Sequence, residues 1–362
     1  MNDRSFQKQP GHAHSSPELI TSSLPTTKQG RMVADLEAVK TFMGETLYGA
    51  DGMRVYLKGR QIGSYSAQEY ESPVDIASCT KSIAAIAIFK AVELELVALD
   101  DKISERLPDY NHIQKIPYNQ ITIRHLLTHT SGYPGNAYFS PADKESGTLG
   151  DDQFFPGLPG NLDLNRRASS HDLKDLVGNS YDYSNPGVQV LSAVLESALA
   201  KSKSYFVPVD EFVREQIFKP LGMNSSALSK KGEVTMLYGG MQSTSADLAK
   251  LGLWVIDALG GKSAVLTSES VTSMLSKPTI PELTWTEPLG HLWWNYKDLG
   301  GHAAIGDRQN FVFVVPEDEL VISRTKGPDG EYRTKGPDGE YSELPFENFK
   351  KSLITLKDAL KV

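Results

Sequence analysis

A serine and a lysine stand three residues apart where a long apolar segment begins, Ser78 to Ala91. The composition of this segment predicts a buried helix. Residues i and i+3 share one face of a helix, with Cβ atoms about 5–6 Å apart. A hydroxyl and an amine at that distance can act as nucleophile and base, because a helix N-terminus favours the serine oxyanion and neutral lysine. The S-x-x-K pattern alone is weak evidence, since both residue types are common.

A second group of polar side chains, Tyr183-Ser184-Asn185, follows about a hundred residues later. It precedes a helix predicted for Val188 to Leu199, whose first turn contains proline and glycine. A phenol can relay a proton and an amide can donate a hydrogen bond. Taken singly, Tyr183 would more readily be a core tyrosine and Asn185 a turn residue before proline.

Together these motifs resemble those of the β-lactamase-like serine hydrolases. That superfamily holds class C β-lactamases, D-alanyl-D-alanine peptidases, carboxylesterases and 6-aminohexanoate-oligomer hydrolases. The similarity covers residues 35–360 and includes the stretches Ile123–Gly132, Pro220–Met223 and Ser243–Ala249. The resemblance implies an acyl-enzyme on Ser78, proton transfer by Lys81 and Tyr183, and no metal or cofactor. It also implies that Asn185 donates a hydrogen bond to Lys81 or to a substrate carbonyl.

The lysine-threonine-glycine motif that lactamases and peptidases carry beside the nucleophile is missing. The corresponding segment here runs from Gly300 to Phe311. The resemblance implies that a backbone N–H of this segment pairs with that of Ser78 as an oxyanion hole. The candidate positions lie between Ala304 and Asp307: Ile305, Gly306 and Asp307.

Two charged or titratable side chains of the same segment have open roles. His302 either binds a substrate carboxylate or caps a strand. Arg308 either binds an anionic substrate group or pairs with Asp307. The missing lysine favours carboxylic esters first, 6-aminohexanoate-type linear amides second, and β-lactams or D-alanyl peptides last.

Other features near the motifs also have two interpretations. Trp293 and Trp294 either pack in the core or line the cleft. The loop 133–168, rich in glycine, proline and aromatic residues, is either a cleft wall or a surface loop. Cys79 is expected to be inert packing. The tandem copy over residues 324–341 is expected to be a surface turn without a chemical role.

Hydrophobic periodicity predicts the elements that position these residues. Strands are expected in a hairpin that turns at Gly59, and over residues 285–296, 303–306, 311–315 and 320–323. Helices are expected over residues 32–47, 121–133, 211–218 and 346–360, and over one ending at Leu259 with Ser245 as its cap. The fold class is therefore α+β: an antiparallel sheet from both chain ends, flanked by helices, with an inserted helical subdomain and the site in the cleft between them.

This interpretation divides the chain into three parts. Residues 1–31 are expected to be poorly ordered, residues 32–110 and 236–362 to form the sheet domain, and residues 111–235 the helical subdomain. The length of 362 residues provides ample core.

Composition excludes several other classes of protein. The net charge of −8 does not predict nucleic-acid binding. The sequence has no run of about 18 apolar residues, so no membrane span is predicted. The N-terminus lacks the apolar core of a secretory signal, and the single cysteine fits a reducing compartment, so we expect a cytoplasmic location. The chain is expected to act as a monomer or homodimer. The i, i+4 pair His125 and His129 lacks the glutamate of a zinc motif, and no G-x-S-x-G elbow is present. A catalytically silent binding relative would be expected to lose Ser78, Lys81 or Tyr183.

Overall fold

The computed structural model describes residues 29–47, 49–68, 71–110, 113–114, 118–132, 177–276, 289–327 and 346–360. The predictions made for residues 1–28, for the loop 133–168 and for most of the tandem copy lie outside these ranges. Within the described part, no helix is long and apolar enough to cross a bilayer.

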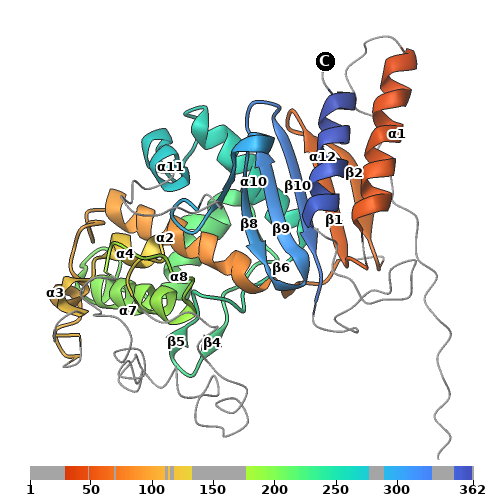
Figure 1. Ribbon diagram of the computed structural model, residues 1–362. Coiled ribbons are helices and arrows are strands. Elements are labelled where there is room, and N and C mark those ends of the chain that lie inside the picture. Colours follow the sequence, from red (N-terminus) through yellow and green to blue (C-terminus); the bar gives the residue numbers. More distant parts are fainter. Residues whose placement is uncertain are drawn as a thin grey trace, which may run out of the picture.

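A six-stranded antiparallel sheet forms the centre of the molecule, with the strand order β2-β1-β10-β9-β8-β7 (Figure 1). Its strands, in chain order, are β1 Gly52–Leu57, β2 Arg60–Ser66, β7 Trp294–Tyr296, β8 Gly301–Gly306, β9 Asn310–Val315 and β10 Leu320–Thr325. The hairpin near the N-terminus joins the C-terminal strand, because β1 pairs with β10 from Gly52↔Thr325 to Leu57↔Leu320. This arrangement confirms the predicted α+β class.

Each face of the sheet has its own apolar core, as the alternation of side chains in a strand requires. On one face, α1 (Gln29–Thr46) and α12 (Phe346–Leu360) pack together, with the Phe42 and Phe349 rings 6.1 Å apart. Phe311 and Phe313 of β9 face this core. Val312 and Val314 face the opposite one, which α10 (Ser245–Leu259) covers.

The second core continues from the sheet into the helical part of the chain. Its central element is α2 (Thr80–Glu93), which is buried along almost its whole length and packs against α7 (Asn185–Lys201). The smaller elements around it are α3 Ile103–Arg106, α4 Ile123–Leu127, α8 Val209–Val213, α9 Lys219–Leu221, α11 Ser268–Leu275 and the strand pairs β3 Val74–Asp75 with β6 Gln242–Ser243 and β4 Lys230–Lys231 with β5 Val234–Thr235. A helix buried on all sides is expected to have a mainly apolar sequence, as α2 does.

The limits predicted for the two domains stay a prediction.

Several predicted element limits were wrong. The helix predicted over residues 121–133 ends at Leu127, because His129 has a φ of 55° and leaves the helical region. Thr244, not Ser245, caps α10: its Oγ1 accepts the Asp247 N–H at 3.1 Å, whereas Ser245 Oγ donates to Glu71. A π-helical turn, Arg214–Phe218, replaces the second half of the helix predicted over residues 211–218. Of the strand predicted over residues 285–296, the described part forms a strand only at β7. Helix α11 was not predicted.

Candidate active site

Ser78 lies in a tight 3-10 turn, Ala77–Cys79, that leads directly into α2. Ala77 has a φ of 50°, a conformation that costs free energy in a residue other than glycine. Two hydrogen bonds hold the turn: Asp75 Oδ1 accepts the Ala77 N–H at 2.7 Å, and Thr80 Oγ1 donates to the Ala77 carbonyl at 2.6 Å. The turn therefore presents the Ser78 hydroxyl at the N-terminal end of the buried helix.

Lys81 lies one turn further along, and its side chain reaches back to Ser78. Its Nζ is 2.8 Å from Ser78 Oγ and 2.5 Å from the backbone carbonyl of Tyr238. Burial lowers the pKa of Lys81 from its usual 10.5 to about 7, because desolvation disfavours the charged amine. In its neutral form the amine can donate to the Tyr238 carbonyl and accept the proton of the Ser78 hydroxyl. The structure thus brings the predicted nucleophile and base into direct contact.

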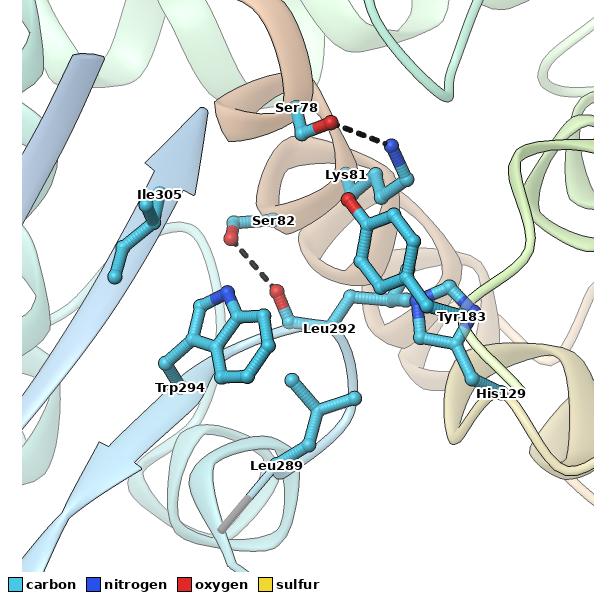
Figure 2. A pocket seen from close by; sticks show the side chains of 9 residues that line it. All are labelled: Ser78, Lys81, Ser82, His129, Tyr183, Leu289, Leu292, Trp294 and Ile305. Carbon is cyan, nitrogen blue, oxygen red and sulfur yellow. Dashed lines mark hydrogen bonds between the residues drawn. The ribbon is translucent and has the colours of Figure 1, made fainter. Parts of the chain in front are cut away.

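Tyr183 completes this group from the segment that precedes α7. Ser184, the N-cap of α7, accepts the Gly187 N–H at 3.0 Å and so fixes the chain next to Tyr183. The phenol hydroxyl points toward Ser78 and Lys81 (Figure 2), and Lys81 Nζ is 4.9 Å from the centre of the ring. Burial raises the pKa of Tyr183 to about 12, although its hydrogen bond with Ser78 opposes the rise. Tyr183 therefore carries its proton at rest and can release it only when a charge develops nearby.

Asn185 is the first residue of α7 and is half buried. Its Oδ1 is buried, and among the described residues it has no hydrogen-bond partner. The acceptors that the structure gives Lys81 are Ser78 and Tyr238, so the predicted contact between Asn185 and Lys81 stays a prediction.

The end of β8 lies directly against the Ser78 turn. A Cβ added to Gly306 would be 3.0 Å from the backbone nitrogen of Ser78 and would overlap the Ile76 carbonyl. Since β7 pairs with β8 only over Gly301–Ala303, it does not cover the last residues of β8 on the side away from β9. The geometry therefore places the backbone of Gly306 beside the Ser78 amide, where an oxyanion hole needs a second donor.

Asp307 follows Gly306 and begins the 3-10 turn Asp307–Gln309 after β8. Its side chain is 60% exposed, and its backbone carbonyl accepts the side-chain amide of Asn310 at 2.8 Å. Of the three candidate positions, the structure places Gly306 against the Ser78 amide and Ile305 in the lining of the cavity that contains Ser78.

His302 and Arg308 are both engaged in contacts within the protein. His302 is the register partner of Asn295 in β7, and its Nδ1 donates to Asn295 Oδ1. The side-chain NH2 group of Asn295 in turn donates to the Leu275 carbonyl at 2.6 Å. Arg308 donates to the Asp75 carbonyl at 2.7 Å and to the Lys326 carbonyl at 3.2 Å. Its guanidinium also lies 3.8 Å from the Asp307 carboxylate. These contacts favour the structural role for each residue over substrate binding.

The catalytic side chains line a small cavity with one polar and one apolar side (Figure 2). Its lining consists of Ser78, Lys81, Ser82, His129, Tyr183, Leu289, Leu292, Trp294 and Ile305. The enclosed space is about 10 Å³, room for about one water molecule. Of the two adjacent tryptophans, Trp294 lines this cavity and Trp293 is fully buried in the core.

Two contributors to the site were missed by sequence reasoning. The first is the carbonyl of Tyr238, which holds Lys81; the only signal was the glycine pair that follows it, Gly239-Gly240. The second is His129, which was considered only as a metal ligand. It is 2% exposed and lines the cavity, and its ring lies 4.6 Å from that of Tyr183.

Cys79 lies next to the nucleophile but takes no part in this arrangement. Its thiol donates to the Asn310 carbonyl at 3.1 Å, and burial raises its pKa. In the described ranges, no group of three or more histidine, cysteine, aspartate and glutamate side chains is arranged to hold a metal ion.

Comparison with known proteins gives one matching family model, described as "Beta-lactamase", over residues 38–332. Penicillin-binding protein 4* of Bacillus subtilis (strain 168) is 28% identical over 163 residues, which are 42% of this chain and 30% of that protein. Esterase EstB of Burkholderia gladioli is 33% identical over 150 residues, 41% of this chain and 36% of that protein. The matched segment thus spans about a third of each relative's length. Among solved structures, EstCE1, a hydrolase with promiscuous acyltransferase activity, superposes with a TM-score of 0.63 at 16% identity, covering 91% of this chain and all of its own.

Proposed function

Because this chain belongs to the Beta-lactamase family, we propose that it is a serine hydrolase that cleaves uncharged carboxylic esters through an acyl-enzyme on Ser78. One observation carries the proposal. Lys81, with a pKa lowered to about 7, lies 2.8 Å from the Ser78 hydroxyl and is held there by the Tyr238 carbonyl. A weak nucleophile with a suitably tuned base in contact is the requirement for acyl transfer.

In the acylation step, Lys81 acts first, the backbone donors second and Tyr183 last. Neutral Lys81 takes the proton of the Ser78 hydroxyl while the serine oxygen attacks the ester carbonyl carbon. The oxyanion that forms accepts hydrogen bonds from the backbone N–H of Ser78 and from one at Ile305 or Gly306. Tyr183 then gives its proton to the departing alkoxide and recovers one from the Lys81 ammonium, so that an alcohol leaves and an acyl-enzyme remains.

Deacylation repeats these transfers with water in place of the alcohol. Tyr183 passes its proton to the neutral Lys81 amine as it removes one from a water molecule that attacks the acyl carbon, so that Lys81 becomes an ammonium. The second oxyanion uses the same backbone donors. When it collapses, the bond to Ser78 breaks, and the serine oxygen regains its proton from Lys81. The products are a carboxylic acid and the restored site.

The apolar side of the cavity supports uncharged acyl groups as substrates. Leu292, Trp294 and Ile305 line it there. The two side chains that sequence reasoning offered for an anionic group, His302 and Arg308, are engaged with Asn295 and Asp75. Substrates recognised through a carboxylate, such as β-lactams and D-alanyl peptides, lack a matching group among the described residues of this cavity. Small linear amides would use the same catalytic groups and are the second candidate.

The test compares three substrates with three proteins. Wild type, Ser78→Ala and Lys81→Ala are assayed with p-nitrophenyl acetate, nitrocefin and a linear 6-aminohexanoate dimer. We expect ester turnover by wild type only, with nitrocefin hydrolysis weak or absent. Full esterase activity in Ser78→Ala would overturn the mechanism, and rapid nitrocefin hydrolysis the choice of substrate. Hydrolysis of the 6-aminohexanoate dimer faster than that of the ester would favour amidase over esterase as the function.

A further inference from the structure

His129 holds the chain on both sides of Tyr183. Its backbone carbonyl accepts the N–H of Asp182 at 2.8 Å, and its Nδ1 accepts the N–H of Ser184 at 3.2 Å. Its ring also contacts the phenol ring, with centroids 4.6 Å apart and planes tilted by 38°. Three contacts from one residue thus surround the single residue that supplies the phenol.

The backbone at His129 is shaped for this contact. The residue has a φ of 55°, in the left-handed region that non-glycine residues seldom occupy. This conformation ends α4 early, and a hydrogen bond from the Thr130 N–H to the His125 carbonyl at 2.8 Å closes the turn. The turn directs both the carbonyl and the ring of His129 toward the segment that carries Tyr183.

The hydrogen bond from Ser184 also fixes the protonation of the imidazole. Because Nδ1 accepts a backbone N–H, the ring proton must be on Nε2, and a second proton on Nδ1 would break the contact. Burial and the neighbouring Lys81 lower the pKa of His129 to about 3. The acceptor is therefore retained throughout the pH range in which an ester hydrolase works.

We propose that His129 is a positioning residue for Tyr183, which aims the phenol at Ser78 and at the leaving group. The inference rests on the proposed function, because it assigns His129 a part in that reaction through Tyr183. It does not make His129 an acid or base. A misplacement of about 1 Å at a catalytic group costs roughly 100-fold in rate, so a residue that holds Tyr183 from three sides acts mainly on kcat.

Three substitutions separate the parts of this contact. His129→Asn keeps an acceptor near the position of Nδ1 and tolerates a positive φ. His129→Phe keeps an aromatic ring without the acceptor, and His129→Ala removes both. With p-nitrophenyl acetate, we expect kcat to fall roughly 100-fold in the alanine and phenylalanine variants and less than about fivefold in the asparagine variant, with KM changed less than about threefold.

A double variant tests whether His129 acts through Tyr183. In a Tyr183→Phe background, His129→Ala is expected to lower kcat by less than about twofold, because the group that it positions is already gone. The matched control is His125→Ala, which removes the nearby histidine of α4, whose Nδ1 accepts the Thr122 N–H. That variant should lower the unfolding temperature and leave kcat within about twofold, since the loss of a helix cap acts on stability.

The outcomes distinguish this inference from the proposed function. Ester turnover that Ser78→Ala abolishes supports the proposed function whatever the His129 variants do. With that turnover present, an unchanged kcat in His129→Ala would overturn the inference alone. An equal loss in the wild-type and Tyr183→Phe backgrounds, or a loss in His129→Asn as large as in His129→Ala, would also overturn it.

Discussion

The backbone carbonyl of Tyr238 lies 2.5 Å from the Lys81 amine, although the two residues are 157 positions apart in the chain. A carbonyl is an acceptor only, so it takes one N–H of the amine in either protonation state. In the neutral state this leaves the nitrogen lone pair for the Ser78 hydroxyl, which lies 2.8 Å from Nζ. The contact with Tyr238 therefore sets the direction of the catalytic base.

Ester hydrolysis is expected to depend on the protonation of Lys81. Because its pKa is lowered to about 7, the amine is mostly protonated below pH 7 and cannot accept the Ser78 proton. We expect kcat/KM to rise through about pH 7 and then to stay level to about pH 9, since the pKa of Tyr183 is raised to about 12. A profile measured from pH 5 to 9 with constant ionic strength checks this. A flat profile would exclude Lys81 as the base.

Replacing Lys81 by methionine should remove activity and increase stability. The buried amine has a pKa of about 7 when folded and 10.5 when unfolded, so the unfolded state binds more protons between these values. The cost of burying it is therefore greatest below pH 7 and shrinks as the pH rises toward 10.5. At pH 7 we expect Lys81→Met to gain roughly 1–4 kcal/mol in the free energy of unfolding by urea, with a kcat lowered roughly 1,000-fold.

The control for this stability effect is Lys40→Met, because Lys40 is exposed on α1. Its effect on the free energy of unfolding should be within about 0.5 kcal/mol. The gain in the free energy of unfolding from Lys81→Met should be smaller at pH 9.5 than at pH 7. A gain that stays constant over this range would contradict the lowered pKa of Lys81.

Tyr183→Phe should affect poor leaving groups more than good ones. If Tyr183 protonates the departing alkoxide, its loss should cost roughly 100-fold or more with ethyl butyrate. The loss should be smaller with p-nitrophenyl butyrate, whose leaving group is stable without a proton. Steady-state kcat/KM for both esters, compared with wild type, measures this difference. Equal losses would mean that Tyr183 does not act on the leaving group.

Gly306→Ala should impair both folding and catalysis. The added methyl would lie 3.0 Å from the backbone nitrogens of Ser78 and Cys79 and would overlap the Ile76 carbonyl, so the turn and the strand must separate. We expect a kcat lowered roughly 100-fold or more, as for a lost oxyanion donor, together with a lower unfolding temperature. Gly44→Ala in α1 is the matched control: nothing lies within 4 Å of its added Cβ, and it should be stabilising by about 0.5–1 kcal/mol. Full activity in Gly306→Ala would show that β8 does not supply a donor.

Cys79 should resist thiol reagents in the folded protein. It is 1% exposed and burial raises its pKa, so the reactive thiolate is scarce. We expect no labelling by iodoacetamide under native conditions and complete labelling in urea, followed by mass spectrometry. Cys79→Ala should keep ester turnover within about fivefold and lose roughly 1–2 kcal/mol of stability, mainly from the cavity. Rapid native labelling that stops turnover would contradict the packing role.

The parts of the fold set by local pattern were predictable from the sequence. The hairpin at Gly59, the helix after Ser78 and the strands β8 to β10 follow from apolar periodicity and turn residues. The errors came where a tertiary contact overrides local preference. Ser245 has the composition of a cap, yet its hydroxyl is used by Glu71, and Thr244 caps α10 instead.

For the site, the motifs indicated the catalytic residues but not the groups that hold them in position. The role of the Tyr238 carbonyl could not be predicted, because the backbone of every residue offers the same acceptor, whatever its side chain. Only the folded chain brings this carbonyl to Lys81. The role of His129 depends on a positive φ that its sequence neighbourhood does not reveal. The contact that favours a structural role for Arg308 is with the Asp75 carbonyl, 233 positions away in the chain, and local sequence does not reveal it.

The pairing of β1 with β10 has a consequence for how the chain folds. Gly52 and Thr325 are register partners, although most of the chain separates them, and Cys79 reaches Asn310 across 231 positions. Such non-local contacts slow folding, because the entropy of closing a long loop is lost before the contacts form. During synthesis, β1 has no partner on one edge until β10 has left the ribosome. The contacts that hold the Ser78 turn against β8 and β9 therefore cannot form until these C-terminal strands have been synthesised.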